Sequence, residues 1–116
     1  WHQEAHKLSG GQLKLLEVGR ALMCEAKLVV MDEPVAGVAP ALAHAILDKL
    51  TKLKQAGVTF LIVEHRLDIV LRYVDYIYVM ANGRIIAEGK EKEILSHPAV
   101  VEVYLGATHG EAQCGV

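Results

Sequence analysis

Two pairs of polar residues follow short apolar runs, and their residue types could perform acid–base and metal chemistry. Asp32 and Glu33 end one such run, and Glu64 and His65 end another. One carboxylate could hold Mg²⁺ together with phosphate oxygens, and the other could orient or deprotonate an attacking water. A neutral His65 could contact a phosphate or that water. Solvated polar groups at two strand ends are the plainer alternative, and these residues alone leave both open.

A glycine-rich segment, Leu8-Ser9-Gly10-Gly11-Gln12, precedes the first apolar pattern. Ser9 and Gln12 have the spacing of a capping box at a helix start. Two glycines in a first helical turn cost about 1 kcal/mol each relative to Ala, so something should compensate. They allow a ligand to approach the backbone, where free N–H groups and the helix dipole favour an anion such as phosphate. A plain capped helix after a turn is the alternative.

The periodicity of apolar residues predicts the elements that position these groups. The pattern alternates buried strands with amphipathic helices and ends in a hairpin around Asn82-Gly83, a strong turn signal. The expected helices cover 10–23, 40–57, 67–74, 91–96 and 99–105, and the expected strands cover 27–32, 58–63, 76–80 and 84–88. This order predicts an α/β fold, with a mostly parallel sheet flanked by helices and a C-terminal antiparallel hairpin. Strands as apolar as the first suit a sheet covered on both faces.

Composition excludes several classes of protein. The chain has 116 residues, 53% of them hydrophobic, which argues against global disorder. The formal net charge of −2 argues against a generally basic surface for nucleic acid. No apolar run approaches the roughly 20 residues of a membrane-spanning helix.

The cysteines and the chain ends add three expectations. Cys24 and Cys114 make no disulfide framework, which favours a reducing compartment. The chain opens with Trp1 in a polar segment, so we expect that the true start is missing. Residues 107–116 have no periodicity and are expected to form a flexible tail.

Taken together, the motifs resemble the ATP-binding cassette (ABC) ATPase family over residues 1 to about 106. The resemblance rests on Leu-Ser-Gly-Gly-Gln, an apolar strand ending in Asp-Glu-Pro and a second one ending in Glu-His. It implies a P-loop-NTPase-type fold, with ATP and Mg²⁺ as ligands. Asp32 then resembles the Walker B aspartate that holds the metal, Glu33 the catalytic glutamate and His65 the switch histidine. The implied signature motif consists of Ser9, Gly10, Gly11 and Gln12.

The resemblance also implies partners. In this family two cassettes sandwich ATP head to tail, and the signature of one subunit faces the γ-phosphate held by the other. Segments such as 35–40, 60–65 and 101–106 are similar to the ATPases of branched-chain amino acid importers. Such subunits are peripheral on the cytoplasmic face of the membrane, where they dock on permeases fed by a substrate-binding protein, and no nucleic acid is involved.

Two departures from the family pattern stand out. A Walker A loop requires Gly, four residues and Gly-Lys-Ser/Thr, whereas Gly89-Lys90 is followed by Glu91 and has no glycine at the required distance. Residues 1–106 are therefore expected to be the C-terminal part of a nucleotide-binding domain, inactive alone. Ala39 stands where the family often has Asp, and it has no side-chain acceptor to cap the next helix. A soluble ABC-type ATPase without a membrane partner, or a non-hydrolysing fragment that binds in trans, are the alternatives.

Overall fold

The computed structural model describes residues 10–105, which fall into two compact units. The first unit runs up to Tyr73 and the second begins at Val74. Ser9 and the predicted tail at 107–116 lie outside the described residues, so both predictions about them remain predictions.

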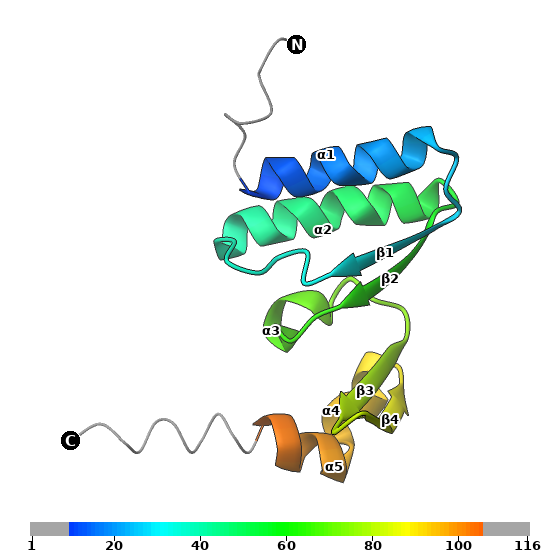
Figure 1. The fold of residues 1–116 in the computed structure, drawn as a ribbon. Helices are drawn as coiled ribbons and strands as arrows, with labels where there is room; N and C mark the ends of the chain where they lie inside the picture. The colour runs from blue at the N-terminus through cyan, green and yellow to red at the C-terminus, as the bar shows by residue number, and fades with distance from the viewer. Residues whose placement is uncertain (1–9, 106–116) are drawn as a thin grey trace, which may run out of the picture. The chain divides into compact units, whose positions relative to one another are not determined.

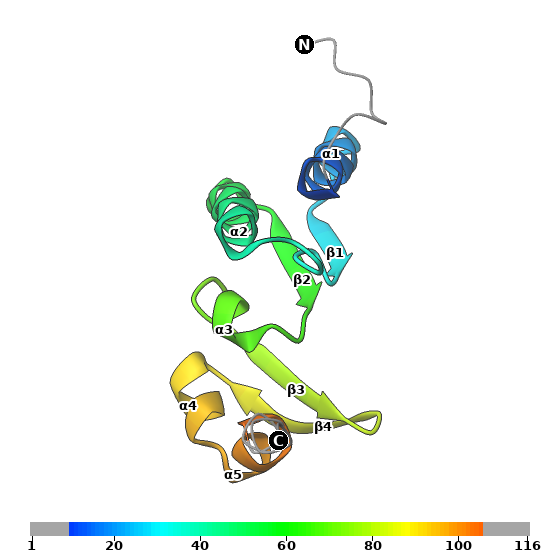
Figure 2. The same ribbon diagram turned by 90° about the vertical axis from the view of Figure 1, so that its left-hand side faces the viewer.

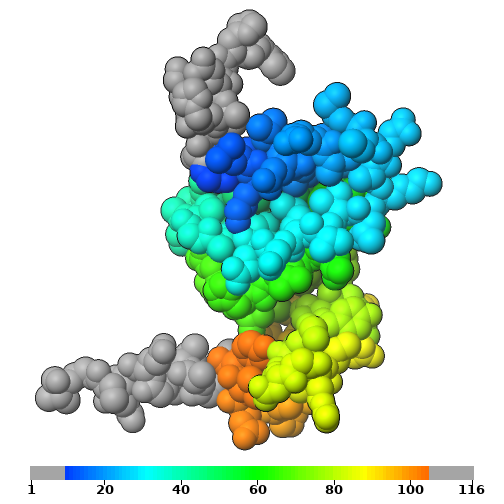
Figure 3. Space-filling model, viewed as in Figure 1, coloured from blue at the N-terminus to red at the C-terminus, as the bar shows by residue number. Residues whose placement is uncertain are grey.

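The first unit consists of two long helices packed on one face of a parallel pair of strands. Its elements are α1 (Gly10–Met23), β1 (Leu28–Asp32), α2 (Pro40–Gln55), β2 (Thr59–Val63) and α3 (Leu67–Val70). In Figures 1 and 2, α1 and α2 lie side by side and cover the same face of β1 and β2. The space-filling view shows the blue atoms of α1 directly against the cyan and teal atoms of the segments that follow (Figure 3).

Strand alternation decides which side chains enter the core of this unit. β1 and β2 are parallel, with Val29 opposite Phe60 and Met31 opposite Ile62. These four side chains face the helices, while the residues between them face the other way. α2 supplies the largest share of the core, and the buried residues are Val18, Val35, Ala43, Ile46, Leu47, Leu50 and Ile69.

The second face of this strand pair is open in the described residues, which differs from the expectation of two covered faces. Leu28, Val30, Leu61 and Val63 are each more than half exposed. The physical reason is that α1 and α2 both pack on the Val29–Met31 side, and no described helix of this unit covers the other side.

The second unit is built on the predicted hairpin. β3 (Ile77–Ala81) and β4 (Arg84–Gly89) pair antiparallel, and α4 (Glu91–Ser96), α5 (Pro98–Val100) and a π-helical turn (Val101–Leu105) follow. Asn82 and Gly83 both have positive φ, at 50° and 74°, as the Asn-Gly signal predicts. Val79, Ala87, Ile94 and Val100 form a small core.

The predicted α/β architecture, with a parallel pair and a C-terminal hairpin, is confirmed, and so is the end of the first helix at Met23. The apolar face of α1 differs in detail from the spacing analysis. Leu13, Leu16 and Met23 are exposed, whereas Gly11 and Val18 are buried. None of the helices within residues 10–105 combines the length and apolar character needed to cross a bilayer.

Candidate functional site

The parallel pairing of β1 and β2 brings the two predicted polar pairs to one edge of the sheet. The register ends with Asp32 opposite Val63, and the Glu33 N–H donates to the Val63 carbonyl at 2.7 Å. The residues just beyond both strands are therefore neighbours although they lie far apart in the sequence. Ligands of open α/β sheets bind at this carboxyl edge.

Glu33 and His65 are in direct contact at this edge. His65 Nδ1 lies 2.9 Å from Glu33 Oε1, which is hydrogen-bond distance. The two side chains are 65% and 50% exposed, so a ligand can reach both. The structure thus joins two residues that the sequence pointed to separately.

Glu33 has an uncommon backbone conformation. Its φ is +47°, in the left-handed region that few residues other than Gly, Asn and Asp adopt. Such a conformation costs of order 1–3 kcal/mol and persists where the surroundings impose it. Here the Glu33 amide is held by Val63, and the Glu33 carbonyl accepts a hydrogen bond from Lys14 Nζ of α1 at 2.5 Å. Sequence reasoning missed Lys14, because a Lys inside an amphipathic helix carries no signal of such a contact.

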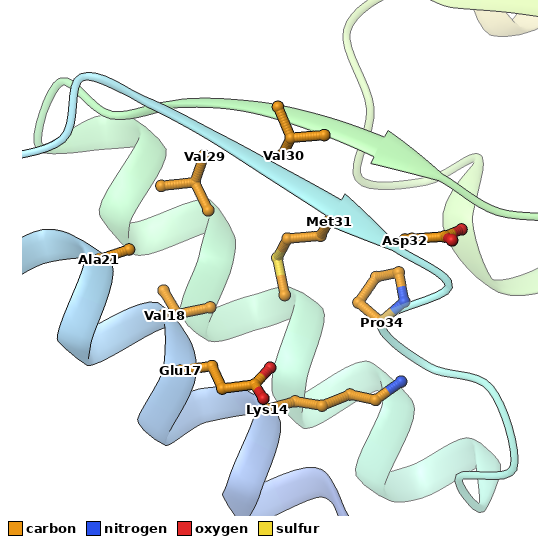
Figure 4. A pocket seen from close by; sticks show the side chains of 9 residues that line it. All are labelled: Lys14, Glu17, Val18, Ala21, Val29, Val30, Met31, Asp32 and Pro34. Atoms are coloured by element: carbon orange, nitrogen blue, oxygen red, sulfur yellow. The ribbon is translucent and has the colours of Figure 1, made fainter.

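Asp32 and Glu33 have different surroundings, as strand alternation predicts. Glu33 contacts His65, whereas Asp32 lies at the rim of a pocket of about 230 Å³ between α1 and β1. In Figure 4, the Asp32 carboxylate extends from the end of β1 away from α1, while Lys14 and Glu17 enter the pocket from the helix. The two carboxylates are therefore placed for separate roles.

The described residues contain no group of three or more His, Cys, Asp and Glu side chains that could hold a metal by itself. Mg²⁺ usually takes only one or two protein carboxylates and completes its coordination with phosphate oxygens and water. A single exposed carboxylate at a strand end, such as Asp32, fits that donor set.

The glycines that open α1 have different environments. Gly10 is exposed, and a Cβ added to it would meet nothing within 4 Å. Gly11 is buried, and a Cβ there would lie 2.9 Å from Leu42 Cδ2 and 3.2 Å from Ile46 Cδ1 of α2. Close helix packing is thus a further reason for glycine at position 11, beside the ligand approach and the capped helix start that the sequence suggests. Gln12 is exposed on the next position of the helix.

The start of α2 bears out the expectation for Ala39. Ala39 is the N-cap residue, in an extended conformation, and makes no side-chain cap. Pro40 occupies the first helical turn, where its lack of an N–H costs nothing.

Comparisons with known proteins agree with these motifs. A family model described as ABC transporter matches residues 1–36, and one described as branched-chain amino acid ATP-binding cassette transporter matches residues 84–110. A relative from Archaeoglobus fulgidus, named probable branched-chain amino acid transport ATP-binding protein LivG, is 66% identical over all of this chain and 45% of its own length. The protein of the same name from Methanocaldococcus jannaschii is 59% identical over 91% of this chain and 43% of its own length.

The fold agrees with solved structures as well. A crystal structure of the ADP conformation of an ATP-binding cassette of an ABC transporter superposes with a TM-score of 0.83 at 59% identity. The alignment covers 91% of this chain and 43% of that one, so the chain spans less than half the length of the relatives it matches. The sequence motifs, the fold and these relatives together show that the chain belongs to the ATP-binding cassette family of ABC transporters.

Proposed function

We propose that the chain is the C-terminal part of an ATP-binding subunit that hydrolyses ATP to drive import of branched-chain amino acids. The observation that carries the proposal is the contact between Glu33 and His65 at the carboxyl edge of two parallel strands. The names of the relatives and the model matching residues 84–110 support the substrate class.

The geometry supports a division of labour among the strand-end residues. Glu33, half exposed, accepts the proton of the attacking water, and its contact with His65 Nδ1 holds the carboxylate in place. Because Nδ1 faces Glu33, the other ring nitrogen of His65 is the one that can contact the γ-phosphate. Asp32 would hold Mg²⁺, and the bound ion would neutralise charge on the phosphates.

The signature segment serves the partner subunit in this proposal. The start of α1, where Gly10 and Gln12 are exposed, has backbone N–H groups and the positive end of the helix dipole, both of which suit a phosphate. Ser9, Gly10, Gly11 and Gln12 would contact the γ-phosphate of ATP held by the second ATP-binding subunit of a head-to-tail dimer. That dimer would dock on permease subunits at the cytoplasmic face of the membrane and meet the substrate-binding protein only indirectly.

We expect the 116-residue chain alone to bind ATP weakly and to show no measurable turnover, because no Gly-rich loop with Gly-Lys-Ser/Thr is present to cradle the phosphates. Calorimetric titration with ATP and Mg²⁺, together with a phosphate-release assay, tests this. A complete cassette that contains the same chain is the comparison and is expected to hydrolyse ATP. Micromolar binding with steady turnover by the isolated chain would contradict the proposal that it is only part of a site.

A further inference from the structure

Hydrogen bonding within the sheet cannot by itself hold Glu33 against His65. Regular pairing ends at Asp32 and Val63, and the Glu33 N–H to Val63 carbonyl bond is the last one between the two strands. Beyond it the chain leaves β1 through a loop, residues 34–39, and leaves β2 through His65 and Arg66. The relative position of the two segments therefore depends on side chains that bridge them.

Glu64 is one such bridge. Its side chain is only 2% exposed. Oε2 accepts the Val35 N–H at 3.4 Å, and Oε1 accepts the N–H groups of His65 at 3.0 Å and Arg66 at 3.4 Å. The same Oε1 lies 3.6 Å from His65 Nδ1. Burying a carboxylate is costly unless its oxygens accept hydrogen bonds, so the bond to the Val35 N–H connects the two segments.

Arg66 bridges the same segments as a hydrogen-bond donor, whereas Glu64 is an acceptor. Its Nη1 donates to the Val38 carbonyl at 2.9 Å and to the Val35 carbonyl at 3.4 Å. Val35 is fully buried in the core of the first unit, so core packing holds the residue that Arg66 contacts in place. Arg66 also holds the loop just before Ala39, the residue that cannot cap α2 with its side chain.

We infer that Glu64 and Arg66 are positioning residues for the proposed ATPase reaction. Together they clamp the 34–39 loop to the turn after β2 and so set the distance between Glu33 and His65. This inference rests on the proposed function, and neither residue is assigned contact with ATP. Loss of the clamp leaves nucleotide binding intact but misplaces the groups that act on the attacking water, an effect that can reach about 100-fold in rate.

The test compares Arg66→Met, Arg66→Lys and Glu64→Gln in the complete cassette. Met keeps the apolar stem of Arg66 and removes its donors, whereas Lys keeps donors and charge. Gln at position 64 leaves one oxygen to accept and turns an NH₂ group toward a backbone N–H. We expect Arg66→Met and Glu64→Gln to lower kcat by about 10- to 100-fold with KM for ATP unchanged. Arg66→Lys is expected to keep most of the activity of the unsubstituted cassette.

Hydrogen exchange provides a second readout besides activity. The Val35 amide donates a hydrogen bond to Glu64 Oε2, so Glu64→Gln is expected to speed its exchange while amides in the middle of α2 keep their protection. Normal kcat in both Arg66→Met and Glu64→Gln would overturn the inference. A loss of kcat that is accompanied by a lower melting temperature in both variants, and that is just as large in Arg66→Lys, would overturn it as well. A cassette without any ATPase activity before substitution would instead contradict the proposed function.

Discussion

Glu33→Gln in the complete cassette is expected to keep ATP binding and to lower ATP hydrolysis by about 10²- to 10⁴-fold, the usual cost of losing a general base. An amide has nearly the shape of the carboxylate and can still hydrogen-bond to His65 Nδ1, which lies 2.9 Å away. It cannot accept the proton of the attacking water. Because Glu33 is half exposed, the melting temperature should hardly change. Nucleotide titration and phosphate release measure the two effects separately.

Asp32→Asn is the matched control for this prediction. It makes the same chemical change one residue earlier, at a side chain that does not share the His65 contact. We expect it to weaken the Mg²⁺-dependent part of ATP binding, because a neutral amide is a poorer ligand for Mg²⁺. Normal turnover in Glu33→Gln, or the same binding defect in both variants, would show that the roles assigned to the two carboxylates are wrong.

Gly10→Ala is expected to raise the stability of the fold while it abolishes ATP-dependent dimerisation. A Cβ at Gly10 meets nothing within 4 Å, so Ala should stabilise α1 by about 0.5–1 kcal/mol through its better helix propensity. If the backbone there approaches a partner's γ-phosphate, the added methyl collides with it and ATP-dependent dimerisation is lost. Thermal unfolding and size-exclusion chromatography with ATP, in a Glu33→Gln background, measure the pair of effects.

Gly19→Ala is the control in the same helix. Gly19 also has open space around its Cβ position but lies two turns away from the signature segment. It should raise the melting temperature like Gly10→Ala and leave dimerisation unchanged. Normal ATP-dependent dimers from Gly10→Ala would rule out phosphate recognition at that position.

Gly11→Ala should behave differently from both. Its Cβ would approach Leu42 Cδ2 to 2.9 Å, and the contact with Ile46 Cδ1 at 3.2 Å involves a buried side chain. We expect a loss of about 1 kcal/mol, at the low end for overpacking because Leu42 is partly exposed and can shift. Combining it with Leu42→Ala removes the closest contact, so the penalty in the double variant should be smaller than the sum of the two single penalties.

Sequence alone determined the elements and the residue types of the site. Apolar runs of strand length, helical periodicity and the Asn-Gly signal are local properties, so the end of α1, the bounds of α4 and the turn at Asn82-Gly83 follow from short stretches of chain. The order of Asp32-Glu33 and Glu64-His65 after two apolar strands also indicated where the carboxyl edge of the sheet would lie. The motifs that carry the family resemblance are local in the same sense.

Only the tertiary structure decided how these residues are used. Which face of α1 is buried depends on where α2 crosses it, which is why Gly11 and Val18 are buried although Leu13 and Leu16 are more hydrophobic. The contact between Glu33 and His65 depends on strand register, and Lys14, Glu64 and Arg66 join segments 19 to 31 residues apart. No local pattern encodes contacts across such separations, because they arise from the packing of whole elements.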